Sequence, residues 1–185
     1  MKRRCFLNSS IGLIAAATLS NHAHASDVGQ SASPRLFDAV RSLFSISEGF
    51  GRNSIYVLYT PWCHLSPKFY DQTRNFLSDV RFNWVPHSGG MIEGKIGTEN
   101  LLSNGTVNGI RNSFIPIGSQ VTPTSTPLAD QQDMKMNAVA SIFISDFGKS
   151  LVTPTLVFDR GGNRIRVVRG APDISYLSRI VSQIK

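Results

Sequence analysis

The stretch VLYTPWCHLSPKF, residues 57–69, places a cysteine where a buried strand gives way to a helix. The apolar and β-branched residues that lead into it predict a strand over residues 54–60. Cys63 follows on a turn, and apolar residues at helical spacing resume after Pro67. Ser66 stands where a second cysteine would complete a redox pair. The stretch alone fits a redox site that has lost half its chemistry, a site suited to one thiol, or a chance cysteine in a loop.

The first 25 residues are typical of an export signal. They begin with basic residues, continue with a short apolar stretch and end in the small-residue pattern AHA, so we expect cleavage after Ala25. Arg3 and Arg4 begin a segment that is similar to a twin-arginine signal, and an ordinary secretory signal also begins with basic residues, so both export routes stay open. No apolar run is long enough to cross a bilayer. The sequence therefore predicts a soluble protein that is exported to the periplasm.

Cleavage after Ala25 would leave a single cysteine. The chain has two cysteines, Cys5 and Cys63, and Cys5 would be removed with the signal. Structural cysteines of exported proteins form pairs, because their compartment is oxidising. A lone cysteine there is either an inert, buried side chain or a reactive thiol, and its surroundings have to decide between the two.

The mature chain is predicted to open with a linker and a helix over residues 26–52. Ser33 suits the N-cap of this helix and Pro34 suits its first position. The next three elements are predicted as strand, helix and strand, over residues 54–60, 67–77 and 80–86. They form a βαβ unit with Cys63 at its first turn.

Residues 87–149 are predicted to be an insertion that is partly helical. Up to Pro127 the chain is rich in Gly, Asn, Ser and Thr, and we expect one short helix near residues 99–114. From Asp130 apolar residues recur every three or four positions, which predicts a longer helix that ends near Gly148. A β-hairpin with a glycine turn and a closing amphipathic helix complete the chain.

The order of these elements predicts an α/β domain over residues 53–185, with a mixed central sheet and helices on both faces. Three segments carry a resemblance to a known family: PWC at residues 61–63, VTP at residues 152–154, and GNRIRVVRGAPDISYLSRIVSQI at residues 162–184. In this order they resemble the thioredoxin-like superfamily, and more closely the catalytic domains of the bacterial disulfide isomerase proteins DsbC and DsbG. The resemblance implies a thioredoxin-like fold with a helical insertion before the strand that follows a cis-proline.

The resemblance implies that Cys63 is the nucleophile of thiol–disulfide exchange. Such a thiol has to be accessible, and a helix N-terminus favours its anion. His64 would add a proton-dependent positive charge, and Ser66 would donate a hydrogen bond to the sulfur. The pair Ser66-Pro67 is itself a good helix start, and in that case Cys63 would lie in a turn before the helix.

Thr153 and Pro154 are expected to form the substrate platform of this site. A cis-proline beside the thiol would leave the Thr153 backbone free to pair with an extended substrate strand. Trp62 is expected to cover the turn that carries Cys63, which we call the active turn. These three residues are therefore the predicted substrate-binding residues.

Ser66 in place of a second cysteine limits the chemistry. Without a resolving cysteine, a mixed disulfide has to be released by the substrate's own thiol, by glutathione or by a membrane redox partner. The expected partners are proteins that carry thiols or disulfides. DsbC-like and DsbG-like proteins also have an N-terminal dimerisation domain, and we expect none here, so the oligomeric state stays open.

We expect this protein to bind no metal, no cofactor and no nucleic acid. His87, Met134 and Met136 could be grouped with Cys63 as a copper site, but they show no ligand spacing and the methionines suit a helix core. The arginines of the C-terminal hairpin lack the aromatic residues of a nucleic-acid surface and are expected to form a solvated edge.

Two functions remain open from the sequence. The first is enzymatic: an exported protein of the disulfide isomerase or reductase type that forms mixed disulfides with substrates through Cys63. The second is a non-enzymatic, chaperone-like or assembly component of an envelope secretion or conjugation machine, with the polar insertion as its partner surface. A reactive thiol in the native protein favours the first, and an inert thiol favours the second.

Overall fold

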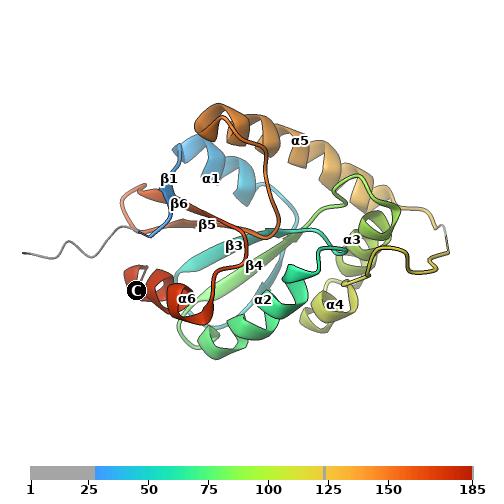
Figure 1. Cartoon of the computed structure of the whole chain (residues 1–185), viewed down its shortest axis with the longest axis horizontal. Coiled ribbons are helices and arrows are strands. Elements are labelled where there is room, and N and C mark those ends of the chain that lie inside the picture. Colours follow the sequence, from blue (N-terminus) through green and yellow to red (C-terminus); the bar gives the residue numbers. More distant parts are fainter. Residues whose placement is uncertain (1–27, 123, 185) are drawn as a thin grey trace, which may run out of the picture.

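The computed structural model describes residues 28–122 and 124–184, and the predicted export signal lies outside them. It shows a six-stranded mixed sheet with helices on both faces (Figure 1). The strands lie in the order β1-β6-β5-β3-β4-β2. Their bounds are β1 Gln30–Ser31, β2 Ile46–Glu48, β3 Ser54–Tyr59, β4 Arg81–Pro86, β5 Thr155–Asp159 and β6 Ile165–Arg169. The helices are α1 Pro34–Arg41, α2 Leu65–Thr73 with a 3₁₀ turn over Arg74–Phe76, α3 Ile92–Asn104, α4 Val107–Asn112, α5 Pro127–Phe147 and α6 Ile174–Gln183.

β3 is a central strand and determines where the candidate site forms. It runs parallel to β4 and antiparallel to β5, as expected for a βαβ unit followed by a hairpin. Because Leu58 of β3 pairs with Thr155 of β5, the residues that follow β3 meet those that precede β5. This register brings Cys63 next to Thr153, which lies 90 residues further along the chain.

Two apolar layers hold the helices on the sheet. α1 and α5 cover one face, where Phe143 of α5 packs in one cluster with Val157 of β5 (Figure 1). α2 and α6 cover the other face, where the ring of Tyr70 lies 5.1 Å from that of Trp84 in β4 (Figure 1). Because both faces are covered, the central strands read as nearly continuous apolar runs. Within the described part of the chain, no helix has the length and apolar character needed to cross a membrane.

The segment before β3 contributes more to the sheet than the predicted linker and helix. α1 begins at Pro34 with Ser33 as its N-cap, as predicted, and the Leu36 N–H donates to Ser33 Oγ at 3.3 Å. β1 and β2 were not predicted, and they add edge strands beside β6 and β4. Strands of two and three residues are too short to show an apolar alternation. Because β1 covers part of β6, the arginine-bearing strand β6 is not the outermost strand of the sheet.

The insertion is more helical than predicted. α3 and α4 replace the one short helix expected near residues 99–114, and α3 begins as early as Ile92. Gly94 and Gly97 obscured α3 in the sequence, because glycine is a weak helix former. Close packing requires both glycines: an added Cβ would lie 2.0 Å from the Ser88 carbonyl oxygen at Gly94 and 2.5 Å from the Pro61 Cβ at Gly97.

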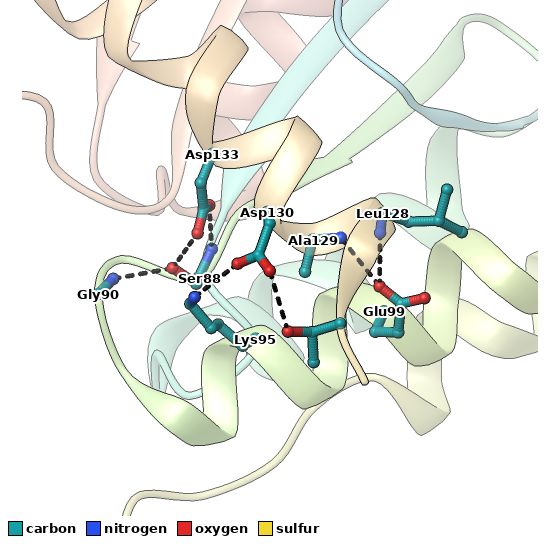
Figure 2. A network of polar contacts seen from close by, with 9 residues as sticks. Ser88, Gly90, Lys95, Glu99, Leu128, Ala129, Asp130 and Asp133 are labelled. Atoms are coloured by element: carbon teal, nitrogen blue, oxygen red, sulfur yellow. Dashed lines mark hydrogen bonds and ion pairs between the residues drawn. The ribbon is translucent and has the colours of Figure 1, made fainter. Parts of the chain in front are cut away.

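Polar contacts fasten α5 to α3 (Figure 2). Glu99 of α3 accepts hydrogen bonds from the N–H groups of Leu128 and Ala129, at 2.8 and 3.0 Å, and so caps the start of α5. Lys95 of α3 forms an ion pair with Asp130 of α5, with Nζ 2.5 Å from the carboxylate oxygen. These contacts lie beside the loop that follows β4 (Figure 2).

Candidate active site

Cys63 lies on the turn between β3 and α2. Its N–H donates to the Thr60 carbonyl at 3.0 Å, and its own carbonyl accepts from the Ser66 N–H at 3.0 Å. α2 begins at Leu65, with His64 as its N-cap, so Ser66-Pro67 does not start the helix. Cys63 therefore lies directly before the N-cap, close to the free N–H groups of the first helical turn.

The structure brings Cys63 together with the predicted substrate platform. The Cys63 Sγ donates a hydrogen bond to the Thr153 carbonyl oxygen, with 3.4 Å between the two atoms. The hydroxyls of Thr60 and Thr153 lie 3.1 Å apart, in a second contact between the same two segments. The Thr153-Pro154 peptide bond is cis, the isomer expected from the sequence.

Trp62 is fixed by the loop that follows β4. Its indole N–H donates to the Ser88 carbonyl oxygen at 2.7 Å. An added Cβ at Gly89 would lie 3.0 Å from Cζ2 of Trp62, so the loop backbone packs closely against the indole. Ser88 is held in turn by Asp133 of α5, whose carboxylate accepts from the Ser88 N–H at 2.9 Å and from its hydroxyl. Trp62 therefore connects the active turn to the insertion.

The two residues expected to tune the sulfur lie in different surroundings. His64 is exposed and its side chain makes no capping hydrogen bond. Ser66 is completely buried, and its Oγ has no hydrogen-bond partner among the described residues. The hydrogen bond predicted from Ser66 to the sulfur is therefore not formed in this structure, and a tuning role for either residue stays a prediction.

The thiol is less accessible than the sequence led us to expect. Cys63 is only 6% exposed, and its sulfur lies against the Thr153 carbonyl oxygen. It still lines a hollow of about 340 Å³, which we call the Cys63 hollow. Trp62, His64, Phe114 and Ile117 are among its other lining residues. A reagent would reach the sulfur through this hollow.

The insertion supplies one wall of the Cys63 hollow, and the sequence did not predict this wall. Phe114 and Ile117 come from the segment after α4, and the Ile115 N–H donates to the Pro61 carbonyl at 3.1 Å. The hydroxyls of Tyr59 and Ser113 lie 2.8 Å apart in the core beneath. Burial raises the pKa of Tyr59, so it stays neutral. No local sequence signal places this segment beside Cys63, because its position depends on how α3 and α4 pack.

His87 is a buried histidine in the loop that follows β4 and contacts Trp62. It is 8% exposed, and burial lowers its pKa to about 4, an effect that the Asp133 carboxylate opposes. Met134 and Met136, which the sequence could group with His87 as a copper site, differ in exposure. Met136 is 5% exposed and Met134 is 68% exposed. In the described part of the chain, no three His, Cys, Asp or Glu side chains gather as a metal site.

Comparison with known proteins finds solved structures that have a similar fold. No protein-family model matches the sequence, and no curated protein matches it significantly. A periplasmic thioredoxin-like protein from Salmonella enterica superposes with a TM-score of 0.56 at 11% identity, over 84% of this chain and 98% of the other. The catalytic domain of Proteus mirabilis ScsC superposes with a TM-score of 0.56 at 14% identity, over 82% of this chain and 98% of the other.

A third similar structure carries a functional description in its name. The thiol-disulfide exchange protein α-DsbA2 from Wolbachia pipientis superposes with a TM-score of 0.57 at 11% identity, over 82% of this chain and 92% of the other. At such identities the likeness concerns the fold, and the closer resemblance to DsbC and DsbG stays a prediction. The protein therefore has a thioredoxin-like fold.

Proposed function

We propose that this protein is an exported, periplasmic thiol–disulfide exchange protein that works through one thiol, that of Cys63. The observation that carries the proposal is the 3.4 Å contact between Cys63 Sγ and the carbonyl oxygen of Thr153, directly before Pro154. It joins a cysteine near a helix start to a backbone segment that a substrate strand can pair with. The fold shared with a thiol-disulfide exchange protein supports the same reading.

The proposed reaction begins at the Cys63 sulfur. The thiol gives its proton to solvent, and the thiolate attacks one sulfur of a substrate disulfide. The substrate S–S bond breaks, a mixed disulfide forms with Cys63, and the second substrate sulfur leaves as a thiolate. Ser66 cannot attack this mixed disulfide, so a substrate thiol, glutathione or a membrane redox partner has to displace Cys63. Attack by a different substrate thiol leaves the substrate with a rearranged disulfide, which is the outcome of an isomerase.

The hydrogen bond from Cys63 to Thr153 has a chemical consequence. A carbonyl oxygen accepts from the thiol and offers nothing to the thiolate, so this contact has to open before attack. A substrate strand pairing with the Thr153 backbone would bring its own disulfide to that position. We infer that substrate binding and exposure of the sulfur occur together.

Reactivation of scrambled ribonuclease tests the proposal, because that enzyme recovers activity only when its disulfides are reshuffled. A chain carrying Cys5→Ser, in which Cys63 is the one remaining thiol, should accelerate the recovery. The same chain with Cys63→Ser should not accelerate it. Equal recovery with both chains would contradict the proposal.

A non-enzymatic binding role is the second candidate. The observation that favours it is the 6% exposure of Cys63, which is typical of an inert structural cysteine. In that case the fold would be retained for binding, as a chaperone-like or assembly component of the envelope. The ribonuclease experiment separates the two candidates, because a binding role does not depend on the Cys63 sulfur.

A further inference from the structure

A second hollow is lined by the loop that follows β4, in which Ser88 and Gly89 contact Trp62. It measures about 440 Å³ and lies between the loop of residues 87–90, the helix α5 and residues 150–151, and we call it the His87 hollow. Gly89 of this loop packs against Trp62, and residues 150–151 lead directly into Thr153. The His87 hollow therefore borders both segments that frame the candidate site.

The walls of the His87 hollow combine apolar surface with two polar groups, the His87 imidazole and the Asp133 carboxylate. The apolar part comes from Met136, Ala140, Ile144 and Leu151. His87 is more than nine-tenths buried, and its Nε2 has no hydrogen-bond partner among the described residues. The Asp133 carboxylate lies at the same hollow, accepts only from Ser88, and forms no ion pair with any residue that the structure describes. A buried polar atom without a partner and a carboxylate without an ion pair both leave hydrogen-bonding capacity for a ligand.

The one cation that lines this hollow, among the described residues, already has a partner. Lys95 is paired with Asp130 at 2.5 Å, and Figure 2 shows its ammonium directed at that carboxylate while Asp133 faces Ser88. Asp130 is therefore the direct partner of Lys95, and Asp133 acts on that ammonium only as a more distant negative charge. The Asp133 carboxylate forms no ion pair with Lys95 and can still accept from a ligand. The ligand that fits this arrangement has an apolar stem and a cationic tip that carries several donors.

We propose that the His87 hollow binds a basic side chain, arginine before lysine, of a substrate polypeptide that lies along Thr153. An arginine stem would cover the apolar wall, and its guanidinium has enough N–H groups for Asp133 and the neutral imidazole of His87 together. Ser150 lies three residues before Thr153, a reach of roughly 10 Å of extended chain. The basic residue would therefore stand within about three positions of the substrate cysteine. This inference rests on the proposed function and names the substrate class for it.

The test measures how fast Cys63 forms mixed disulfides with short peptides. Each peptide has one cysteine in a disulfide with thionitrobenzoate, and arginine, citrulline or glutamate at one position near that cysteine. Attack by the Cys63 thiolate breaks this disulfide, joins the peptide to Cys63 and releases the coloured thionitrobenzoate anion. A parallel reaction with 2,2′-dithiodipyridine, which has no side chain to recognise, measures the reactivity of Cys63 itself.

We expect the arginine peptide to react about tenfold faster than the citrulline peptide at one or more positions, the effect of one charge-assisted hydrogen bond. Asp133→Asn should reduce this ratio to near one. Asp146→Asn is the matched control, because Asp146 of the same helix also accepts from a serine N–H and hydroxyl, those of Ser33, but does not line the hollow. The control should keep the ratio.

Ala140→Leu provides a second variant that fills the hollow and leaves every charge in place. It should lower the arginine-to-citrulline ratio even if Asp133→Asn does not fold. Equal rates for all peptides, or a preference for glutamate, would overturn the inference while leaving the proposed function intact. Failure of Cys63 to react with 2,2′-dithiodipyridine would overturn both.

Discussion

At the scale of single residues, His87 is a buried base whose neutral form the fold requires. Burial lowers its pKa to about 4, from an ordinary value of 6.5. The unfolded chain therefore binds a proton at a higher pH than the folded chain does. The contribution of this group to stability is fully present above pH 6.5 and is lost as the pH falls toward 4.

His87→Gln should remove this pH dependence, because glutamine does not titrate in that range. The free energy of unfolding of the unaltered protein should fall by up to about 3 kcal/mol more than that of the variant between neutral pH and pH 4, as measured by urea denaturation. His64→Gln is the control, since His64 is exposed. Parallel pH curves for the His87 variant and the unaltered protein would contradict the assignment of a neutral, buried imidazole.

Ser66 is the residue that separates this site from a two-cysteine site. Because its hydroxyl is buried without a partner among the described residues, Ser66→Ala should leave stability unchanged or raise it by about 1 kcal/mol. Ser66→Cys should also fold, since a thiol tolerates an apolar site. It should add the resolving step and allow the protein to reduce insulin disulfides with dithiothreitol as electron donor. A Ser66→Cys variant no more active than the unaltered protein would show that the two positions do not cooperate.

At the scale of elements, the packing of α3 on the active turn is the feature that the insertion adds to the site. An added Cβ at Gly97 would lie 2.4 Å from the Ser113 carbonyl oxygen and 2.5 Å from the Pro61 Cβ. Gly97→Ala should therefore lower the free energy of unfolding by about 1–3 kcal/mol and shift the active turn. Gly109→Ala in α4 is the matched control, because its nearest neighbour is the end of the Leu101 side chain, at 3.1 Å.

Urea denaturation of both glycine variants measures this difference. The rate at which Cys63 reacts with 2,2′-dithiodipyridine should change in Gly97→Ala and stay the same in Gly109→Ala. If the two variants lose equal stability, the contact between α3 and the Pro61 turn does not constrain the site.

At the scale of the whole molecule, the sequence predicted those parts of the fold that have strong local signals. The strand before Cys63, the N-cap at Ser33 and the closing hairpin are defined by apolar runs, caps and turn residues, and the structure has all of them. The two edge strands and α3 were missed, because they depend on pairing and on close packing at Gly94 and Gly97. Long-range contacts of this kind leave no periodic pattern in the sequence.

The candidate site shows the same division between local sequence signals and long-range packing. Cys63, Thr153 and Pro154 were predicted together, and the register between β3 and β5 explains why they meet. The limited exposure of the thiol was not predicted, and neither was the wall at Phe114, which arises from where the insertion folds back. The buried environment of His87 was missed for the same reason.

Reaction of Cys63 in the native protein is the most direct measurement of its role. A Cys5→Ser chain, with Cys63 as its one thiol, would be mixed with a peptide disulfide in buffer and in urea, and the adduct at Cys63 would be followed by mass spectrometry. We expect the native chain to form the mixed disulfide at least as fast as the unfolded chain, because the fold presents the sulfur beside the Thr153 backbone. A native chain that stays unmodified while the unfolded chain reacts would contradict an exchange function and would leave a thioredoxin-like scaffold with an inert cysteine.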